Sequence, residues 1–543
     1  MPSSNPFPER DIDPLAPIEQ LVRWLADGVL HGLLGLLVGL VAARLMRARH
    51  LHWSWATAAL VLIALAPIRP AGSTLTLAVA ALTASIRGRR WHRQDLDAGG
   101  DMAEIAAARY GPLDPLRVAG MIARQRLASA LGHERRRRQG ELLLGRATGR
   151  RTVCIPFDAS TGGRHTLVVG ATGSGKTTTQ TSMVVQAIEQ GMGAVIIDPK
   201  GDRDLRRQAR CTANQAGRPF LEWTPSGGCV YNPYARGSET EIADKVLAGE
   251  RFTEPHYLRQ SQRYLGHVVR ALRRSGLEVS LQLIVDHLDP ATLEGLVRGL
   301  PESEAAPTHA YLDSMTARQQ SDLAGVRDRL AILAESDIGA WLDPRTAGAG
   351  RLDLLAAARS HAVVYFSLES DSRPLLTQML GAAIVQDLQT VIAALQGRPE
   401  ATLVVIDEFS AIAAEQVVRL FGRARSAGFS LLLGTQELCD LRLPGRERLL
   451  EQVMGNLSAL IAHRQVVPSS AEMISSLAGQ EGAWKVSSHS DGRSTRTRTS
   501  KPVLDSGKVM RLGQGWAAVI VLDRDGRAEI ARMHSNNHTK GRL

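Results

Sequence analysis

The sequence predicts an α/β protein in which a largely parallel β-sheet is interrupted by a helical insert and preceded by apolar segments. From Arg150 onward, short apolar runs that are typical of buried strands alternate with helical segments. Residues 251–345 break this alternation with helical segments alone, and three apolar stretches lie within residues 28–86. Strands that alternate with helices favour a parallel sheet covered on both faces. We therefore expect one discontinuous domain, residues 146–250 and 346–530, with an inserted all-α domain.

The composition of the chain points to an anionic partner and a reducing compartment. Its 543 residues suggest about three domains, and its formal charge of +11 favours nucleic acid or acidic lipid as a partner. A merely basic surface is the alternative. The four cysteines form no CxxC pair, so neither a disulfide framework nor a zinc site is expected: Cys154, Cys211, Cys229 and Cys439.

The N-terminal part, residues 1–93, is expected to be a membrane anchor with two to three transmembrane helices. Its apolar stretches, residues 28–43, 53–68 and 71–86, reach spanning length when flanking residues are included. Buried helices of a soluble protein are the alternative. Basic clusters follow the first and third stretches: Arg44, Arg47, Arg49, and Arg87, Arg89, Arg90, Arg93. Basic loops stay in the cytoplasm, so three spans with the N-terminus outside satisfy both clusters, whereas two spans would misplace one.

Polar segments connect and end the expected domains. Residues 94–145 are expected to form a helical connector, and residues 531–543 a disordered tail. Residues 485–502, rich in Ser, Thr and Arg, are expected to be a mobile loop or the arm of a hairpin. Strands are expected at residues 166–169, 194–198, 219–223, 362–367, 402–406, 429–434, 458–463 and 516–522. Helices are expected at residues 178–190, 256–274, 291–300, 308–335, 375–395 and 411–424.

A phosphate-binding loop follows the first of these strands. Residues 170–177 match the pattern G-x-x-x-x-G-K-[ST] in full, between an expected strand and an expected helix. The candidate binding residues are Gly170, Ala171, Thr172, Gly173, Ser174, Gly175, Lys176, Thr177 and Thr178. In such a loop, Lys176 reaches the β- and γ-phosphates and the Thr177 hydroxyl binds Mg²⁺. The sequence therefore predicts nucleotide binding, and a chance match is the alternative.

Polar residues follow two later strands that should end at the same edge of the sheet. Asp407 and Glu408 come directly after the apolar run 403–406, the arrangement of a Walker B element. We expect Asp407 to hold the Mg²⁺ shell and Glu408 to orient and activate the attacking water. Gln436 ends the next strand and is expected to sense the γ-phosphate, unless it is an ordinary loop residue.

In their order along the chain, these motifs resemble those of type IV secretion coupling proteins of the TraG/TraD kind. The further motifs of the resemblance are Asp-Pro-Lys-Gly at 198–201, Asn-Pro at 232–233, Asp-Glu-Phe at 407–409, Thr-Gln at 435–436 and Gly-Asn at 455–456. The resemblance covers roughly residues 141–525. Members of that family commonly have two membrane spans with the N-terminus inside, whereas three spans are expected here.

The resemblance implies a RecA-like P-loop NTPase domain with an inserted all-α domain. It implies a homo-hexamer with ATP and Mg²⁺ at subunit interfaces, an anchor in the bacterial inner membrane and a cytoplasmic motor domain. It implies delivery of a relaxase-bound DNA single strand, in preference to duplex, or of secreted proteins to the components of a secretion channel. By position, Arg425 matches the arginine that reaches the neighbouring subunit's nucleotide; Arg423 is a close competitor, and a helix-capping surface role is the alternative.

Two other functions remain open on the sequence. A double-strand DNA translocase of the FtsK kind shares the membrane anchor and the motor, but usually carries a long linker and a winged-helix end, neither of which is evident. A nucleotide-gated receptor that recruits substrates with negligible turnover would not need an intact Lys176, Asp407 and Glu408.

Overall fold

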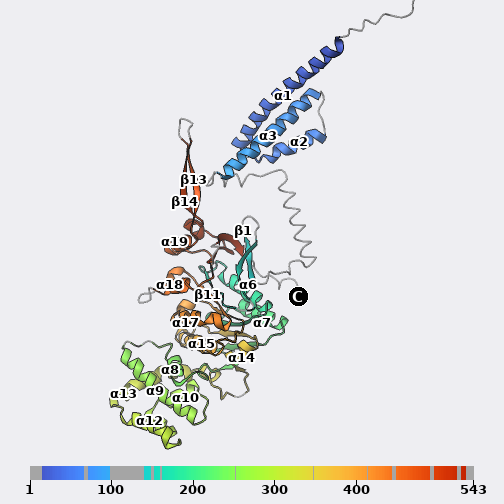
Figure 1. Cartoon of the computed structure of the whole chain (residues 1–543). Helices are drawn as coiled ribbons and strands as arrows, with labels where there is room; N and C mark the ends of the chain where they lie inside the picture. Colours follow the sequence, from blue (N-terminus) through green and yellow to red (C-terminus); the bar gives the residue numbers. More distant parts are fainter. Residues whose placement is uncertain are drawn as a thin grey trace, which may run out of the picture. The chain divides into compact units, whose positions relative to one another are not determined.

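The structure is a computed structural model. It describes residues 15–533 except 50, 66–70, 98–139, 148–151, 159, 161, 251, 253, 347, 413, 443–447, 489–493 and 523–526. The chain forms two compact units (Figure 1). One comprises residues 1–137 and 480–501, and the other residues 138–479 and 502–543.

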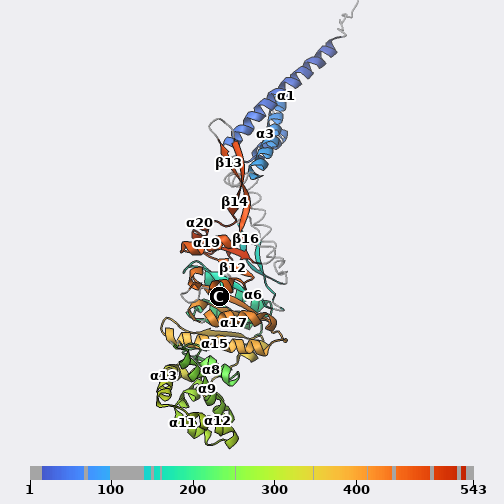
Figure 2. The same ribbon diagram turned by 60° about the vertical axis from the view of Figure 1, so that its left-hand side comes forward.

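The first unit contains three N-terminal helices: α1 (Ala16–Ala48), α2 (Ser54–Leu65) and α3 (Ala71–Asp97). Helices α1 and α3 lie side by side and run in the same direction, since Gly35 of α1 faces Thr76 of α3 and Gly39 faces Ala80 (Figures 1 and 2). A Cβ atom at Gly39 would lie 2.5 Å from the carbonyl oxygen of Ala80. These small residues therefore allow the two backbones to approach closely.

The basic clusters after the first and third apolar stretches lie at one end of this helical unit. Arg47 of α1 forms an ion pair with Asp95 of α3, with 2.7 Å between Nη2 and Oδ1. The guanidinium groups of Arg47 and Arg87 lie 5.3 and 5.0 Å from the ring centroid of Trp91. Among the helices of the described part, Pro17–Ala48 is apolar and long enough to cross a membrane, whereas α2 is shorter. The same criteria select α15 (Pro374–Ala394), but that helix is mostly buried in the second unit.

The first unit also contains a two-stranded sheet. It is formed by β13 (Gln480–Ser488) and β14 (Ser494–Pro502). The expected loop or hairpin arm at residues 485–502 is therefore strand in its described part.

The second unit is built on a twelve-stranded sheet with the order β2-β1-β16-β15-β12-β3-β11-β10-β4-β9-β5-β6. The strands are β1 (Glu141–Ala147), β2 (Thr152–Pro156), β3 (Thr166–Val169), β4 (Gly193–Asp198), β5 (Phe220–Thr224), β6 (Gly227–Gly228), β9 (Val363–Ser367), β10 (Thr402–Ile406), β11 (Phe429–Thr435), β12 (Ala459–Ala462), β15 (Trp516–Val521) and β16 (Arg527–Met533). From β12 to β5 all neighbours pair in parallel, as predicted. The strands β15, β16, β1 and β2 extend this sheet in antiparallel fashion.

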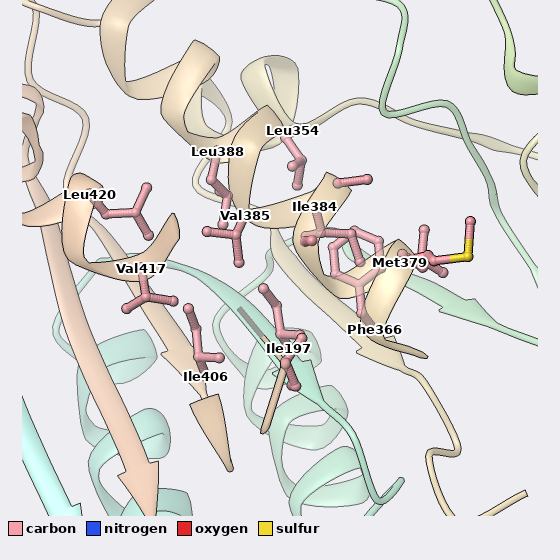
Figure 3. Packing of buried hydrophobic residues seen from close by; sticks show 14 of the residues in the cluster. Ile197, Leu354, Phe366, Met379, Ile384, Val385, Leu388, Ile406, Val417 and Leu420 are labelled. Carbon is pink, nitrogen blue, oxygen red and sulfur yellow. The ribbon is translucent and has the colours of Figure 1, made fainter. Parts of the chain in front are cut away.

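Helices cover both faces of the sheet because the buried side chains of each strand alternate between two cores. Val168 of β3 packs on the face of α6 (Lys176–Glu189) and α7 (Arg203–Gln215), whereas its neighbour Leu167 belongs to the other core. On that second face, Ile197 and Ile406 of the sheet lie beneath Val385 of α15 and Val417 of α17 (Ala414–Ala424), as Figure 3 shows.

The expected all-α insert is present. Its helices are α8 (Glu239–Val246), α9 (Pro255–Arg274), α10 (Leu281–Asp286), α11 (Pro290–Val297), α12 (Glu302–Asp313) and α13 (Ala317–Ala334). The insert therefore starts earlier than the expected residue 251, because α8 precedes it. The helix predicted at residues 308–335 is two helices, because Thr316 starts a new one with a capping box to Gln319. The short strands β7 (Val230–Tyr231) and β8 (Arg351–Leu352) pair where the insert leaves and rejoins the sheet domain.

Shorter helices complete the second unit. They are α14 (Leu354–Arg359), α16 (Phe409–Ile412), α18 (Leu449–Met454), α19 (Pro468–Leu477) and α20 (Ser506–Met510).

The boundaries predicted for the connector and the tail are wrong. Of the connector expected at residues 94–145, residues 94–97 belong to α3, and residues 141–145 belong to β1, in which Leu142 and Leu144 are buried. Of the tail expected at residues 531–543, residues 531–533 belong to β16, which pairs with β1. The rest of the connector, residues 98–139, and residues 534–543 lie outside the described residues.

Candidate nucleotide-binding site

The predicted phosphate-binding loop connects the end of β3 to the start of α6. Gly173 and Gly175 have φ angles of +76° and +110°, in the left-handed region that favours glycine. A Cβ atom at Gly170 would lie 2.5 Å from Ser174 Oγ and 2.7 Å from Cβ of His463, so a larger residue does not fit there. The loop thus opens directly onto the N-terminus of α6, whose first N–H groups have no acceptor within the helix.

His463 lies fully buried beneath this loop, just after β12. Its Nδ1 atom is 3.1 Å from the carbonyl oxygen of Trp516, so Nδ1 carries the proton and donates it. Its Nε2 atom therefore accepts from the hydroxyl of Thr179 in the first turn of α6, at 3.0 Å. Burial lowers the pKa of His463 to about 4, which keeps the ring neutral near pH 7. No motif or spacing in the sequence indicates this residue.

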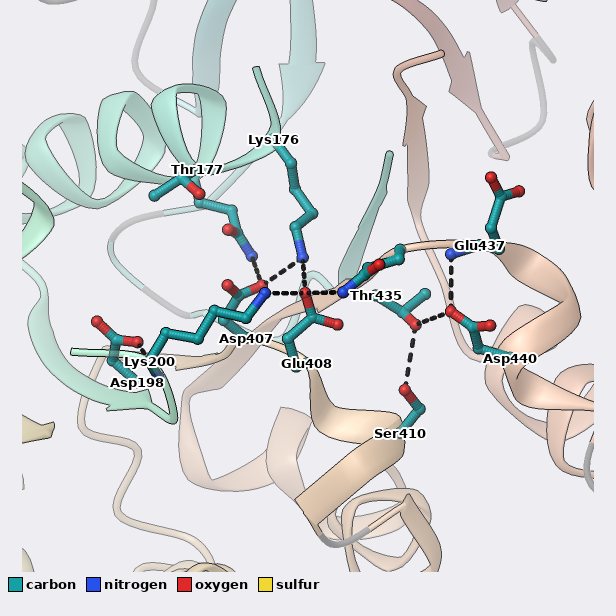
Figure 4. A network of polar contacts seen from close by, with 12 residues as sticks. Lys176, Thr177, Asp198, Lys200, Asp407, Glu408, Ser410, Thr435, Glu437 and Asp440 are labelled. Carbon is teal, nitrogen blue, oxygen red and sulfur yellow. Dashed lines mark hydrogen bonds and ion pairs between the residues drawn. The ribbon is translucent and has the colours of Figure 1, made fainter. Parts of the chain in front are cut away.

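Lys176 joins the two acidic residues predicted for the site (Figure 4). Its Nζ atom lies 2.9 Å from Asp407 Oδ1 and 2.8 Å from Glu408 Oε1. The side chains are 9%, 11% and 11% exposed, respectively. Asp407 Oδ1 also accepts from Gln180 of α6, at 3.3 Å. The sheet thus brings Lys176, Asp407 and Glu408 together, as expected from the sequence.

Two further side chains reach Glu408 from neighbouring strand ends. Gln436, which follows β11, donates from Nε2 to Glu408 Oε1 at 3.3 Å, at the edge where it was predicted. Lys200, which follows β4, donates to the same oxygen at 3.1 Å. Burial raises the pKa of Glu408, but the ammonium groups of Lys176 and Lys200 outweigh burial and hold it below the usual value. The carboxylate is therefore charged at neutral pH.

The two arginines considered for the neighbouring subunit lie elsewhere. Arg425 begins a short 3₁₀ helix before β11 and packs over Gly163, which precedes β3. Arg425 and Gly163 therefore both lie at the amino ends of parallel strands, β11 and β3, whereas Lys176 and Asp407 lie at the carboxyl ends of the strands. Because β11 spans about 20 Å at ~3.3 Å per residue, Arg425 is far from its own subunit's site. Arg423 and Arg425 are both exposed.

Lys200, within the Asp-Pro-Lys-Gly motif, was not among the residues predicted for the site. Its position two residues after a buried strand could have indicated it, because this position lies at the same edge of the sheet as the phosphate-binding loop. Gln180, four residues after Lys176 on α6, could have been found from helical spacing.

Comparison with protein families matches residues 150–501 to the type IV secretion-system coupling protein DNA-binding domain. Among solved structures, the unbound monoclinic form of the bacterial conjugative coupling protein TrwBdeltaN70 is similar, with a TM-score of 0.56 and 16% identity. That similarity covers 75% of this chain and 91% of the other.

The plasmid coupling protein TrwB in complex with ADP and Mg²⁺ is similar to a comparable extent. Its TM-score is 0.53 and its identity 16%, over 70% of this chain and 87% of that one. No curated protein matches the chain. The structural similarities establish the RecA-like α/β fold with its all-α insert. Because the family match extends over more than half of the chain, this protein belongs to the type IV secretion-system coupling protein family.

Proposed function

We propose that this protein is a membrane-anchored ATPase that recruits DNA, or a relaxase-bound single strand, and pumps it toward a type IV secretion channel. The observation that carries the proposal is the convergence of Lys176, Asp407, Glu408 and Gln436 beside the phosphate-binding loop. A receptor without turnover would have no use for a buried, charged carboxylate at this position.

The side chains present fit ATP with Mg²⁺. Ser174 Oγ is buried in the loop and has no hydrogen-bond partner in the described part of the chain, so it is available to a phosphate oxygen. Thr177 and Asp407 would hold Mg²⁺, which typically takes one or two protein ligands together with substrate phosphates. No group of three or more His, Cys, Asp or Glu side chains within the described residues is arranged to hold a metal without a substrate. Solved TrwB structures contain ADP with Mg²⁺ and an ATP analogue, which supports the proposal.

Each residue then has a defined task. Bound ATP and Mg²⁺ supply a γ-phosphoryl group whose charge the metal partly neutralises. Lys176 exchanges its two carboxylate partners for phosphate oxygens, and the loop N–H groups and Thr178 line the phosphate chain. Glu408 orients the attacking water and accepts its proton. Gln436, bonded to the same carboxylate, is placed to respond to the γ-phosphate.

A ring of subunits, most simply the homo-hexamer that the family resemblance implies, would complete the site. The location of Arg425 on the opposite edge of its own sheet supports an action on the neighbouring subunit's nucleotide, and Arg423 is the competitor beside it. A guanidinium that stabilises charge on the transferred phosphoryl group is worth about 10³–10⁵ in rate.

Residues 1–93 are proposed to be a three-span anchor in the bacterial inner membrane, with the motor in the cytoplasm. The parallel course of α1 and α3 supports this topology, because it brings both basic clusters to the same side. The test is a single cysteine at residue 5, 48 or 92, exposed on intact cells to a membrane-impermeant thiol reagent. Only the variant at residue 5 should react; protection there would favour two spans.

The transported substrate is tested by the ATPase rate of the full chain in detergent or vesicles. The rate should rise with single-stranded DNA, and the effect should weaken steeply with salt, because phosphate contacts release counterions. Stimulation by duplex alone would favour an FtsK-like translocase. Absence of turnover in every condition would leave a nucleotide-gated receptor. Binding of relaxase or channel components can then be measured with the same preparation.

A further inference from the structure

We infer that Lys200 is a positioning residue for Glu408: it holds one carboxylate oxygen, Oε1, so that the other, Oε2, faces the attacking water. The inference rests on the proposed ATP hydrolysis and goes beyond it by assigning the lysine of the Asp-Pro-Lys-Gly motif. Three features of the structure support it: the turn that carries Lys200, the strand order and the contacts of Glu408.

The turn after β4 is held rigidly by Asp198, which is buried at 2% exposure. Asp198 Oδ1 accepts from the backbone N–H groups of Lys200 and Gly201, at 2.9 and 3.0 Å. Its Oδ2 accepts from the N–H of Asp202 at 2.6 Å and from the hydroxyl of Tyr365 at 2.5 Å. A single buried carboxylate thus fixes the backbone of Lys200, Gly201 and Asp202.

Glycine is required at the next position of the turn. Gly201 has a φ angle of +72°, and a Cβ atom there would lie 2.8 Å from Ser367 Oγ. A larger residue would strain the backbone and press on β9. The motif therefore specifies one turn shape, in which Lys200 is the residue whose side chain is directed at the nucleotide site (Figure 4).

The strand order brings this turn to the catalytic carboxylate. β4 and β10 are parallel neighbours, and Ile197 pairs with Ile406, so the residues that follow them leave the sheet side by side. Glu408 is two residues beyond β10 and Lys200 two residues beyond β4. The ion pair between them follows directly from this register.

The two oxygens of Glu408 have different surroundings. Oε1 accepts from Lys176, Lys200 and Gln436, whereas the described residues donate no hydrogen bond to Oε2. Glu408 also has a φ angle of +46°, which is uncommon for a residue with a side chain and which the surrounding contacts must hold. When Lys176 binds the phosphates instead, Lys200 and Gln436 keep their hydrogen bonds to Oε1.

The Lys200 side chain is 47% exposed, so its replacement removes a half-solvated contact rather than a part of the core. The fold should therefore tolerate the change.

The test compares Lys200→Met and Lys200→Arg with the parent in the full chain. We expect Lys200→Met to lower kcat about tenfold, a part of the 10²–10⁴-fold that a positioned acid or base contributes. KM for ATP and the affinity for a non-hydrolysable analogue should stay within about twofold of the parent, because Lys200 is not a phosphate ligand.

Two controls separate positioning from a general loss of charge. Lys200→Arg keeps the cation and its hydrogen bonds, so kcat should be recovered in part. Arg203→Met removes an exposed cation from the same segment and should change neither kcat nor KM. A parent protein without ATPase activity would overturn the proposed function itself. An active parent whose kcat is unchanged in Lys200→Met would overturn the role of Lys200 alone.

Discussion

Replacement of Asp387 by leucine should destabilise the second unit strongly, because it breaks a buried ion pair. Lys245 of α8 and Asp387 of α15 are 1% and 4% exposed, with 2.9 Å between Nζ and Oδ1. Lys245 Nζ also donates to the carbonyl oxygens of Pro233 and Arg236, at 2.6 and 3.0 Å. The hydroxyl of Tyr231 donates to Asp387 Oδ2 at 3.0 Å. The pair therefore joins the start of the all-α insert to the helix that covers the sheet.

The size of the effect follows from these contacts. Removing one partner of a buried ion pair costs about 3–5 kcal/mol, because the other charge stays buried without compensation. Tyr231 would also lose its acceptor, which adds about 1 kcal/mol or more. The second unit has about 380 residues, so at ~2.1 cal/mol/K per residue its entropy of unfolding is roughly 0.8 kcal/mol/K. A loss of about 4 kcal/mol therefore lowers the melting temperature by roughly 5 °C.

The assay is thermal unfolding of the full chain, followed by tryptophan fluorescence. Trp223 and Trp341 report on this region, since Trp223 donates from Nε1 to the carbonyl oxygen of Trp341. The double variant Lys245→Met, Asp387→Leu should recover at least half of the loss, because no charge remains buried. A single variant that melts within 2 °C of the parent, or a double variant less stable than the single, would refute the reasoning.

Three further predictions concern catalysis, contact between subunits and the pH dependence of stability. Glu408→Gln should abolish turnover in an ATPase assay. It should nevertheless bind a fluorescent ATP analogue more tightly than the parent, because Lys176 loses one of the two carboxylates that compete with the phosphates. Weaker binding of the analogue would contradict this prediction. Arg425→Ala subunits mixed with Lys176→Ala subunits should regain ATPase activity that neither has alone, and no recovery would argue against action between subunits. Burial lowers the pKa of His165 and His463 to about 4. Because these rings are neutral when folded and ordinarily titrate near 6.5, stability should fall as the pH drops from about 6.5 to 4. A melting temperature constant over that range would contradict the last prediction.

The parts of the site that the sequence predicted are those encoded by contiguous residues. The phosphate-binding loop and the Asp407-Glu408 pair each lie in one strand and the turn that follows it. Gln436 could be placed because it ends the next strand of a parallel sheet. Lys200 could be placed at the same edge by its position after a strand, but its contact with Glu408 could not be predicted, because that contact depends on β4 being the neighbour of β10. Strand order is set by the packing of the whole sheet rather than by any local pattern.

The missed strands have the same cause. β1 and β16 pair although nearly 400 residues separate them in the chain, and neither has an apolar core pattern as long as that of β4 or β10. Alone, Glu141–Ala147 is a short, partly exposed segment after a polar connector. Its strand conformation depends on two partners, β2 on one side and β16 on the other. The residues of Glu141–Ala147 alone do not indicate that these two partner strands exist.

The position of β1 between those two partners has a mechanical consequence. β1 is the first strand of the second unit, and it is hydrogen-bonded on both sides to antiparallel strands. Tension applied along the axis of β1 at Glu141 would load both ladders in shear, so that they share the load at once. A strand at the rim of the sheet, with one ladder, would have half of that support. The second unit can therefore resist tension along β1 with two ladders of hydrogen bonds.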